Sequence, residues 1–147
     1  MNHIDVKIKK LNENAKVPTY GTEFSAGADI YACIDEDVKI LPGATATIKT
    51  GISVETPEGF MLLVFARSGL SIKQGLAPAN KVGVVDSDYR GEVIVALHNH
   101  SDEAKVVSNG DRVAQMVFVP YFKANFEETT SLSNTARGAG GFGSTGK

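Results

Sequence analysis

The sequence predicts an all-β protein built as a sandwich, a jelly roll or a barrel. Apolar and polar residues alternate along several short stretches, which is the periodicity of strands with one buried face. Turn residues recur between these stretches at intervals of roughly ten residues, as in sandwiches and barrels. The length of 147 residues suits one core, so we expect a single compact β domain.

Five stretches are expected to form strands from their own composition. Residues 4–8 and 38–40 alternate apolar with polar side chains, and residues 45–54 are rich in β-branched residues. Residues 60–65 form a continuous apolar run, which favours a strand buried on both faces. Residues 112–119, directly before a proline, are expected to form another strand.

Two more strands and one helix are predicted from turn and capping signals. Residues 82–85 and 92–97 are β-rich and flank the sequence SDYRG, which indicates a hairpin with a long loop. The expected helix covers residues 68–75, with Ser68 as its N-cap and Gly75 as the residue that ends it.

The C-terminal part differs in composition from the rest of the chain. Residues 127–136 carry few apolar side chains, and the last ten residues, GAGGFGSTGK, hold five of the fifteen glycines. We therefore divide the chain into a β domain of residues 1–126 and an arm of residues 127–147. Because the arm has no core face, we expect it to dock on a neighbouring subunit.

The glycines of the arm also match two phosphate-binding motifs. Gly138, Gly140 and Gly143 spell G-x-G-x-x-G, and the letters GFGSTGK spell the first part of G-x-x-x-x-G-K. Both motifs require a following helix, whose N-terminal N–H groups hold the phosphate, and this sequence shows none after the glycines. The general property remains, because glycines allow consecutive backbone N–H groups to form an anion-binding nest.

Composition argues against several classes of partner. The formal net charge of -2 and the sequence pI of about 5.9 give no broad basic surface for nucleic acid. The single cysteine, Cys33, excludes a disulfide framework and a thiolate zinc cluster, and we expect a buried, inert thiol. The sequence has neither an apolar run of the roughly 18 residues that span a membrane nor a secretion signal. We expect a soluble cytoplasmic protein without a nucleic-acid or membrane partner.

Four interior stretches carry more polar groups than plain strands need. Taken singly, their acids are ordinary turn formers and their arginines ordinary surface cations. Taken together, they favour a phosphorylated ligand with Mg²⁺, because this ion prefers oxygen ligands and phosphates supply most of them. The stretches are SAGADIYA (residues 25–32), ARSGLS (66–71), GVVDSDYRG (83–91) and GDRVAQ (110–115).

Histidines suggest a second metal hypothesis. His98 and His100 alternate along an expected strand and share one face, so they could bind zinc. Structural zinc sites usually use four protein ligands, and no third or fourth lies nearby in the sequence. We therefore favour ordinary strand residues over a zinc site.

A fifth stretch, RGAGGFGSTG at residues 137–146, follows these four. In their order and spacing, the five stretches resemble the five motifs of the homotrimeric dUTPases, the deoxyuridine triphosphate nucleotidohydrolases. The resemblance runs from about Ser25 to the C-terminus. It implies a jelly-roll-like subunit, a homotrimer, and active sites at subunit interfaces that the arm of another chain closes. It also implies hydrolysis of dUTP to dUMP and pyrophosphate, which limits uracil incorporation into DNA and supplies dUMP for dTMP synthesis.

The resemblance implies a role for each matching residue. Asp86 would be the general base that activates a water for in-line attack on the α-phosphorus. Tyr89 would pack beneath the deoxyribose and exclude a ribose 2′-hydroxyl. Asp29 would contact Mg²⁺ through bound water, and Arg112 would support the site. The uracil edge would be recognised by Asn80, Gly83, Val84, Val85 and Ile94, and the phosphates by Arg67, Ser68, Gly69 and Gln115. The arm would supply Phe142 to stack on the uracil, and Arg137, Gly143, Ser144 and Thr145 to cover the γ-phosphate.

Two alternatives stay open at this point. The related dCTP deaminases share the fold but carry a catalytic glutamate where this chain, aligned through Gly91 and Asn99, has Ala96, which disfavours deamination. A non-catalytic, nucleotide-binding jelly-roll module is the other alternative. The presence of Asp86, Tyr89 and Phe142 argues against it.

Overall fold

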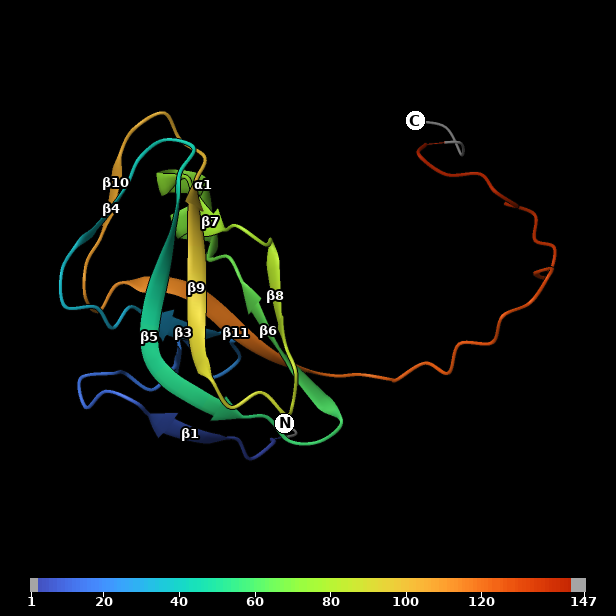
Figure 1. Ribbon diagram of the computed structural model, residues 1–147, viewed down its shortest axis with the longest axis horizontal. Helices are drawn as coiled ribbons and strands as arrows, with labels where there is room; N and C mark the ends of the chain where they lie inside the picture. Colours follow the sequence, from blue (N-terminus) through green and yellow to red (C-terminus); the bar gives the residue numbers. More distant parts are fainter. Residues whose placement is uncertain (1–2, 144–147) are drawn as a thin grey trace.

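The computed structural model describes residues 3–143, and the fold is a β-sandwich with one short helix (Figure 1). One sheet has four strands in the order β1-β5-β9-β7, and the other has five in the order β2-β3-β11-β6-β8. Strands β10 and β4 form a separate two-stranded ribbon. The prediction of an all-β protein with one short helix is confirmed.

Six of the seven predicted strands have bounds close to the expected ones, whereas the strand expected at residues 4–8 lies at Lys7–Lys10. Four short strands of the described part of the chain, β2, β3, β7 and β10, were not predicted. The four-stranded sheet consists of β1 (Lys7–Lys10), β5 (Thr45–Glu55), β9 (Glu92–Asn99) and β7 (Leu76–Pro78). The five-stranded sheet consists of β2 (Thr19–Tyr20), β3 (Ala28–Tyr31), β11 (Arg112–Pro120), β6 (Phe60–Phe65) and β8 (Val82–Val85). The ribbon consists of β10 (Lys105–Val107) and β4 (Val38–Ile40), and the helix is α1 (Ser68–Gln74).

The core is made by the alternate side chains of the strands. Every second residue of β9 is buried, from Val93 to Asn99. Leu62 of β6 and Met116 of β11 belong to the same buried cluster. Burying one such apolar side chain stabilises a fold by about 1.5–3 kcal/mol. The alternate residues of β6 are only half-buried, so the prediction of a strand buried on both faces is wrong for the single chain.

The predicted hairpin between residues 82–85 and 92–97 does not form. Strand β8 pairs with β6, and β9 pairs with β5 and β7, so the intervening loop passes from one sheet to the other. The physical reason is tertiary pairing that overrides adjacency in the chain: β8 pairs along its whole length with β6 in one sheet, and β9 pairs with β5 in the other. As a result β8 keeps one unpaired edge, and β9, which pairs with β7 only at Leu97–Asn99, keeps its first part unpaired on that side.

Residues that are distant in the sequence lie against both ends of the helix. The N-cap is Arg67, in an extended conformation with φ of -88° and ψ of 131°, and not Ser68 as predicted. An ion pair between Arg67 and Asp29 holds Arg67 at this position. The prediction that Gly75 ends the helix is confirmed, since its φ is 70° and an added Cβ would lie 2.7 Å from the Cβ of Ser101.

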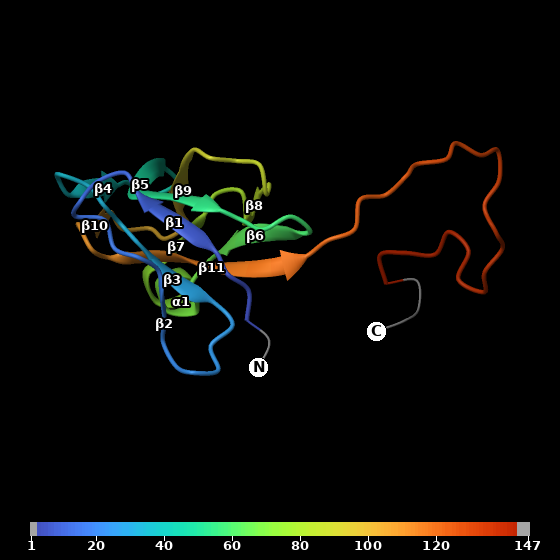
Figure 2. The ribbon, with the colours of Figure 1, turned by 90° about the horizontal axis from the view of Figure 1, so that it is seen from below.

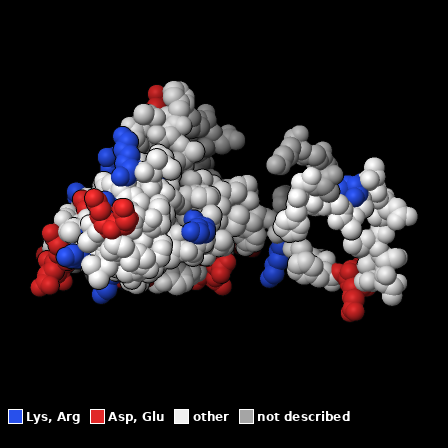
Figure 3. Space-filling model, turned by 90° about the horizontal axis from the view of Figure 1, so that it is seen from above, with Lys and Arg blue, Asp and Glu red and all other residues white. Residues whose placement is uncertain are grey.

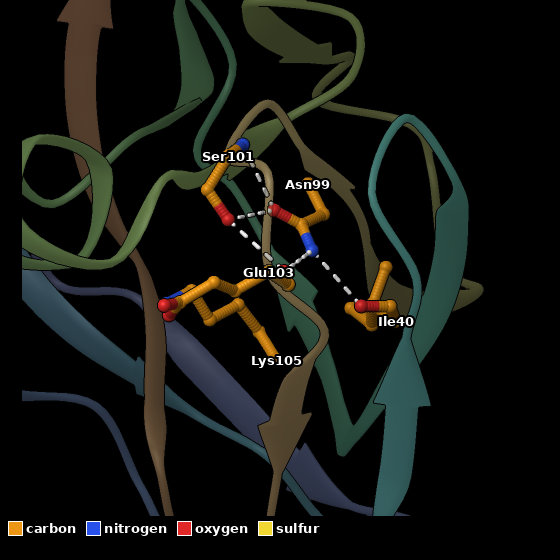
Figure 4. Close-up of polar contacts among 5 residues, drawn as sticks. All are labelled: Ile40, Asn99, Ser101, Glu103 and Lys105. Atoms are coloured by element: carbon orange, nitrogen blue, oxygen red, sulfur yellow. Dashed lines mark hydrogen bonds and ion pairs between the residues drawn. The ribbon is translucent and has the colours of Figure 1, made fainter.

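A buried amide joins the ribbon to the end of β9 (Figure 4). The side chain of Asn99 donates to the carbonyl oxygens of Ile40 and Glu103, at 2.9 Å and 2.7 Å. Its amide oxygen accepts from the backbone N–H and the hydroxyl of Ser101, at 3.0 Å and 2.7 Å. Because both ends of the amide are satisfied, its complete burial is stabilising.

The chain leaves the sandwich at Pro120, the last residue of β11. Figures 1 and 2 both show the following segment running away from the body. Its large apolar side chains Phe122, Phe126 and Leu132 are exposed. Among the described residues, no helix combines the length and the apolar character that crossing a membrane requires. Cys33 is buried as expected.

Candidate active site

The unpaired edge of β8 and the first part of β9, which β7 does not cover, border a hollow, here called the edge hollow, with a volume of about 300 Å³. Alternate N–H and C=O groups of an edge strand point away from its partner, so this hollow offers fixed backbone donors and acceptors. The residues of the β domain that were assigned to the uracil edge, the sugar and water activation all line it. These are Asn80, Gly83, Val84, Val85, Asp86, Tyr89 and Ile94.

The aromatic ring of Tyr89 is held at the mouth of the edge hollow by its own loop. The backbone N–H of Tyr89 donates to the carbonyl of Asp86 at 3.2 Å, which closes a turn. The hydroxyl donates to the carbonyl of Glu92 at 3.0 Å. A Cβ on Gly91 would lie 2.9 Å from Cε2 of the ring, so the ring occupies space that only glycine leaves free.

A second hollow, here called the arginine hollow, has a volume of about 430 Å³ and is lined by the β-domain residues assigned to the phosphates. Antiparallel pairing puts Gln115 of β11 beside Asp29 of β3 and Phe65 of β6. The chain after Phe65 leads directly to Arg67, so three separate sequence stretches meet here. The lining includes Asp29, Arg67, Ser68, Gly69, Arg112 and Gln115.

Charge is organised in the arginine hollow around one carboxylate. Oδ1 of Asp29 accepts from Nε of Arg67 at 2.6 Å, and Oδ2 accepts from a terminal nitrogen of Arg112 at 3.2 Å. Gln115 donates to the carbonyl of Ala66 at 2.9 Å, which fixes the approach to the helix. Two guanidinium groups against one carboxylate leave a local positive excess, which suits an anion. On the face of the body seen in Figure 3, by contrast, acidic and basic residues are interspersed.

The arm residues lie apart from both hollows. Arg137 and Phe142 are exposed, and the chain around them does not return to the body of the protein (Figure 1). Phe142 and Gly143 both have positive φ, of 50° and 88°. The assigned residues Ser144 and Thr145, and the motif residues Gly146 and Lys147, lie outside the described residues.

The single chain thus divides the expected site into three parts. The edge hollow and the arginine hollow have no lining residue in common, and the described part of the arm contacts neither. Ser25 lines the arginine hollow and Glu92 lines the edge hollow, and neither was assigned from the sequence. Ser25 lies inside the stretch SAGADIYA, and Glu92 directly follows GVVDSDYRG, so proximity to these stretches was the available signal.

The histidines of the zinc hypothesis have other contacts. Nδ1 of His98 lies 3.0 Å from the hydroxyl of Thr45, and Nε2 of His100 lies 3.2 Å from the carbonyl of Ser71. Within residues 3–143, no three His, Cys, Asp or Glu side chains are grouped so that they could hold a metal ion.

Comparison with known proteins identifies the family. The model of the dUTPase family matches residues 13–146. The deoxyuridine 5'-triphosphate nucleotidohydrolase of Desulfitobacterium hafniense (strain DSM 10664 / DCB-2) is 50% identical over 149 residues, and the match covers 99% of each chain. The enzyme of the same name from Anaplasma marginale (strain St. Maries) is 44% identical over 145 residues, covering 97% of this chain and 99% of the relative. The chain belongs to the dUTPase family.

Solved structures support the same assignment. The dUTPase of Staphylococcus bacteriophage 80alpha with dUPNHPP has a TM-score of 0.88 at 28% identity, covering 97% of this chain and 99% of that chain. A mutant dUTPase from phage phi11 of S. aureus, described with a structural Mg(II) ion, has a TM-score of 0.80 at 25% identity, covering 89% of this chain and 100% of that chain. The expected jelly-roll-like fold and the family resemblance are both confirmed.

Proposed function

We propose that this protein hydrolyses dUTP to dUMP and pyrophosphate at sites built from both hollows and the arm. Family membership supports the reaction, and the observation that carries the assignment of residues is the edge hollow. Its lining brings together the amide of Asn80, backbone groups of β8 and β9, the ring of Tyr89 and the carboxylates of Asp86 and Glu92. We assign the reaction to Asp86, because the carboxylate of Glu92 already accepts from the N–H of Gly51.

The strand edges of this hollow suit a uracil. Uracil presents a fixed pattern of donor and acceptor groups, and backbone groups of β8 near Val84, together with the amide of Asn80, can complement it. Cytosine exchanges a donor and an acceptor at one position, so it would leave buried polar groups unpaired, which costs about 1–3 kcal/mol. Ala96 also lines the hollow, so the position of the deaminase glutamate carries no carboxylate.

The chemistry assigned to Asp86 is proton transfer. An ionised carboxylate only accepts hydrogen bonds, so it can orient a water and take its proton as the water oxygen attacks the α-phosphorus. The new bond forms between this oxygen and phosphorus, and the bond to the bridging oxygen breaks. Pyrophosphate leaves with the electron pair of that bond. The side chains of Arg67 and Gln115 and the hydroxyl of Ser68 would hold the phosphate oxygens in line.

The donors around Asp29 fit Mg²⁺ held mainly by the substrate. A carboxylate has about four lone-pair sites, and the two arginines use two of them. The free sites can accept hydrogen bonds from metal-bound water, while the phosphates supply direct ligands. When bound, Mg²⁺ would neutralise charge on the phosphates. Asp29 would set the position of its water ligands.

We propose that the site is completed in a homotrimer, as the resemblance to the homotrimeric dUTPases implies, and the division of the site in the single chain supports this. Each hollow is open in the single chain, and the two are lined by different residues. The exposed Phe122, Phe126 and Leu132 need a partner surface, since exposed apolar side chains in a row mark interaction sites. We propose that one subunit supplies the edge hollow, a second the arginine hollow, and an arm closes over both. Residues 127–147 form this arm.

This activity would limit uracil incorporation into DNA and supply dUMP for dTMP synthesis. Because dUTP is a nucleotide of the cell interior, the proposal agrees with the expected cytoplasmic location.

The test is pyrophosphate release from dUTP, dCTP, dTTP and UTP, each with Mg²⁺ and with excess chelator. We expect release from dUTP alone, and only with Mg²⁺. Release from UTP at a similar rate would contradict the role of Tyr89, and release in chelator would contradict the role of Mg²⁺. Release from none of the four would favour a non-catalytic nucleotide-binding module, and deamination of dCTP would favour the deaminase alternative.

A further inference from the structure

Strand β5 is irregular beside the loop of residues 86–91. β5 pairs with β9 in a constant register from Thr45 to Lys49, and the register shifts before Ser53. Gly51 lies inside this shift with a φ of 67°, a conformation that favours glycine. The regular backbone ladder is therefore interrupted at the residues that lead into the loop.

Hydrogen bonds that use side chains replace the interrupted ladder. Three of them connect this part of β5 to the start of β9 and to the loop. The residues that they join are those that would lie opposite each other if the pairing of Thr45 to Lys49 continued without a shift. They run from the hydroxyl of Thr50 to the carbonyl of Val93, from the N–H of Gly51 to the carboxylate of Glu92 (2.8 Å), and from the hydroxyl of Ser53 to the carbonyl of Arg90 (2.6 Å).

Of these three hydrogen bonds, the one from Ser53 reaches the loop itself. Ser53 is only 6% exposed, so its hydroxyl is held in place as a donor. The guanidinium of Arg90 in turn donates to the carbonyls of Ser87 at 2.6 Å and Tyr89 at 3.1 Å. Nε of Arg90 also lies 3.9 Å from the carboxylate of Glu55. The backbone of Arg90 is thus held by β5, and its side chain holds the rest of the loop.

We propose that Ser53 is a positioning residue for the hydrolysis of dUTP, acting through Arg90 on the loop that carries Asp86 and Tyr89. The inference rests on the proposed function, which makes Asp86 the base and Tyr89 the sugar contact. Displacing a reacting group by about 1 Å can cost about a hundredfold in rate. The loop has no hairpin ladder to fix it, because β8 and β9 pair with other strands. The contact from β5 supplies the missing constraint.

The principal test compares Ser53→Ala with Ser53→Thr. The alanine variant removes the donor to Arg90, and we expect kcat for dUTP to fall at least about tenfold and the preference for dUTP over UTP to decrease. The threonine variant keeps the hydroxyl, and Ser53 lines a surface hollow of about 390 Å³ that offers space for one added methyl group, so both quantities should stay near those of the parent protein. An alanine variant with unchanged kcat and unchanged preference would overturn the proposal.

Thr45→Ala is the matched control. It also removes one hydroxyl contact between β5 and β9, the one to His98, but at the opposite end of β5 from the loop. We expect kcat and the dUTP preference to remain those of the parent protein. An equal loss of preference in this variant would mean that the effect is general destabilisation, and the proposal would fail.

A second variant tests the proposal if Ser53→Ala does not fold, and a crystal structure tests the position of the loop directly. Arg90→Met removes the donor to both loop carbonyls at a largely exposed side chain, so it should fold even if Ser53→Ala does not, and it should show the same losses. A crystal structure of Ser53→Ala, or of Arg90→Met, should show the loop displaced. If the parent protein hydrolyses no dUTP, the proposed function fails, whereas an undisplaced loop refutes the positioning role by itself.

Discussion

Asp29 and Arg67, 38 residues apart in the chain, form a charged hydrogen bond of 2.6 Å that joins β3 to the start of α1. The side chains are 15% and 24% exposed, so water screens this pair less than it screens a surface ion pair. Arg112 approaches the other oxygen of the same carboxylate. One acid thus orients two cations toward the hollow proposed for the phosphates.

Asp29→Asn should therefore disturb the arginines and the binding of Mg²⁺ together. The amide has a nitrogen that would face a guanidinium, so one charged hydrogen bond is lost. Such bonds contribute about 1.5–3 kcal/mol. We expect dUTP turnover to fall about tenfold or more, and the Mg²⁺ concentration needed for half-maximal rate to rise. Asp37→Asn, at an exposed loop position, is the control, and an equal effect there would contradict the assignment.

Asp86→Asn should abolish catalysis while substrate still binds. The amide cannot take a proton from water, and general base catalysis contributes about 10²- to 10⁴-fold. Turnover is measured by pyrophosphate release, and binding by calorimetry with dUTP. Asp88→Asn is the control from the same loop, because Asp88 does not line the edge hollow. Unchanged turnover in Asp86→Asn would remove this residue from its proposed role.

Gly91→Ala should relax the discrimination between dUTP and UTP. The added Cβ would lie 2.9 Å from Cε2 of Tyr89, so the ring must leave the position proposed beneath the sugar. The φ of Gly91 is not positive, so the backbone accepts alanine and the effect belongs to the ring. The ratio of kcat/KM for the two nucleotides measures it. In a Tyr89→Ala background, Gly91→Ala should change nothing further, and an additive effect would contradict this explanation.

The fold could be predicted from sequence where the signal is local. Alternation located β4, a continuous apolar run located β6, and Gly75 ended the helix as glycine does at such positions. The partner of β8 could not be predicted, because adjacency in the chain favoured β9 while the actual partner is β6, about twenty residues earlier. The N-cap was missed for the same reason, since a tertiary ion pair from Asp29 fixes Arg67.

The candidate site could be predicted as a set of residues but not as an arrangement. Order and spacing of the motifs identified Asp86 and Arg67, yet nothing local indicates that their hollows are separate in one chain. The hydrogen bond from Ser53 to Arg90 could not be predicted either, because it depends on a register shift between two strands that are distant in the sequence. The sequence shows which residue types are present, whereas the pairing and register of the strands depend on the whole fold.

Deleting residues 138–147 should leave the body folded and nearly inactive. Phe142 is fully exposed, and the described part of this segment packs on nothing in the sandwich, so the midpoint of thermal unfolding should not change. Activity should fall because the stacking aromatic and the phosphate nest are lost. Phe142→Ala should reproduce part of the loss, and a fully active truncated protein would contradict the role of the arm.

The ion pair between Lys7 and Glu55 should make the attachment of β1 to β5 depend on pH. The Lys7 ammonium, 2.8 Å from the carboxylate, lowers the pKa of Glu55 through a hydrogen bond and charge attraction, and Arg90 adds a smaller effect. Because the folded pKa lies below the unfolded one, the stabilisation is complete above the unfolded pKa of a glutamate. It is lost as the pH falls through the lowered value.

Lys7→Met should therefore lower the free energy of unfolding at neutral pH, and the difference from the parent protein should shrink as the pH falls below the usual range of glutamate. Added salt should also shrink it, because both side chains are exposed. Urea unfolding at several pH values measures the difference. Lys9→Met, on the same strand and without an ion pair among residues 3–143, should show no such pH dependence. A difference that stays constant from acidic to neutral pH would contradict a stabilising role of the charge of Lys7, because methionine keeps most of the unbranched stem and removes only the ammonium.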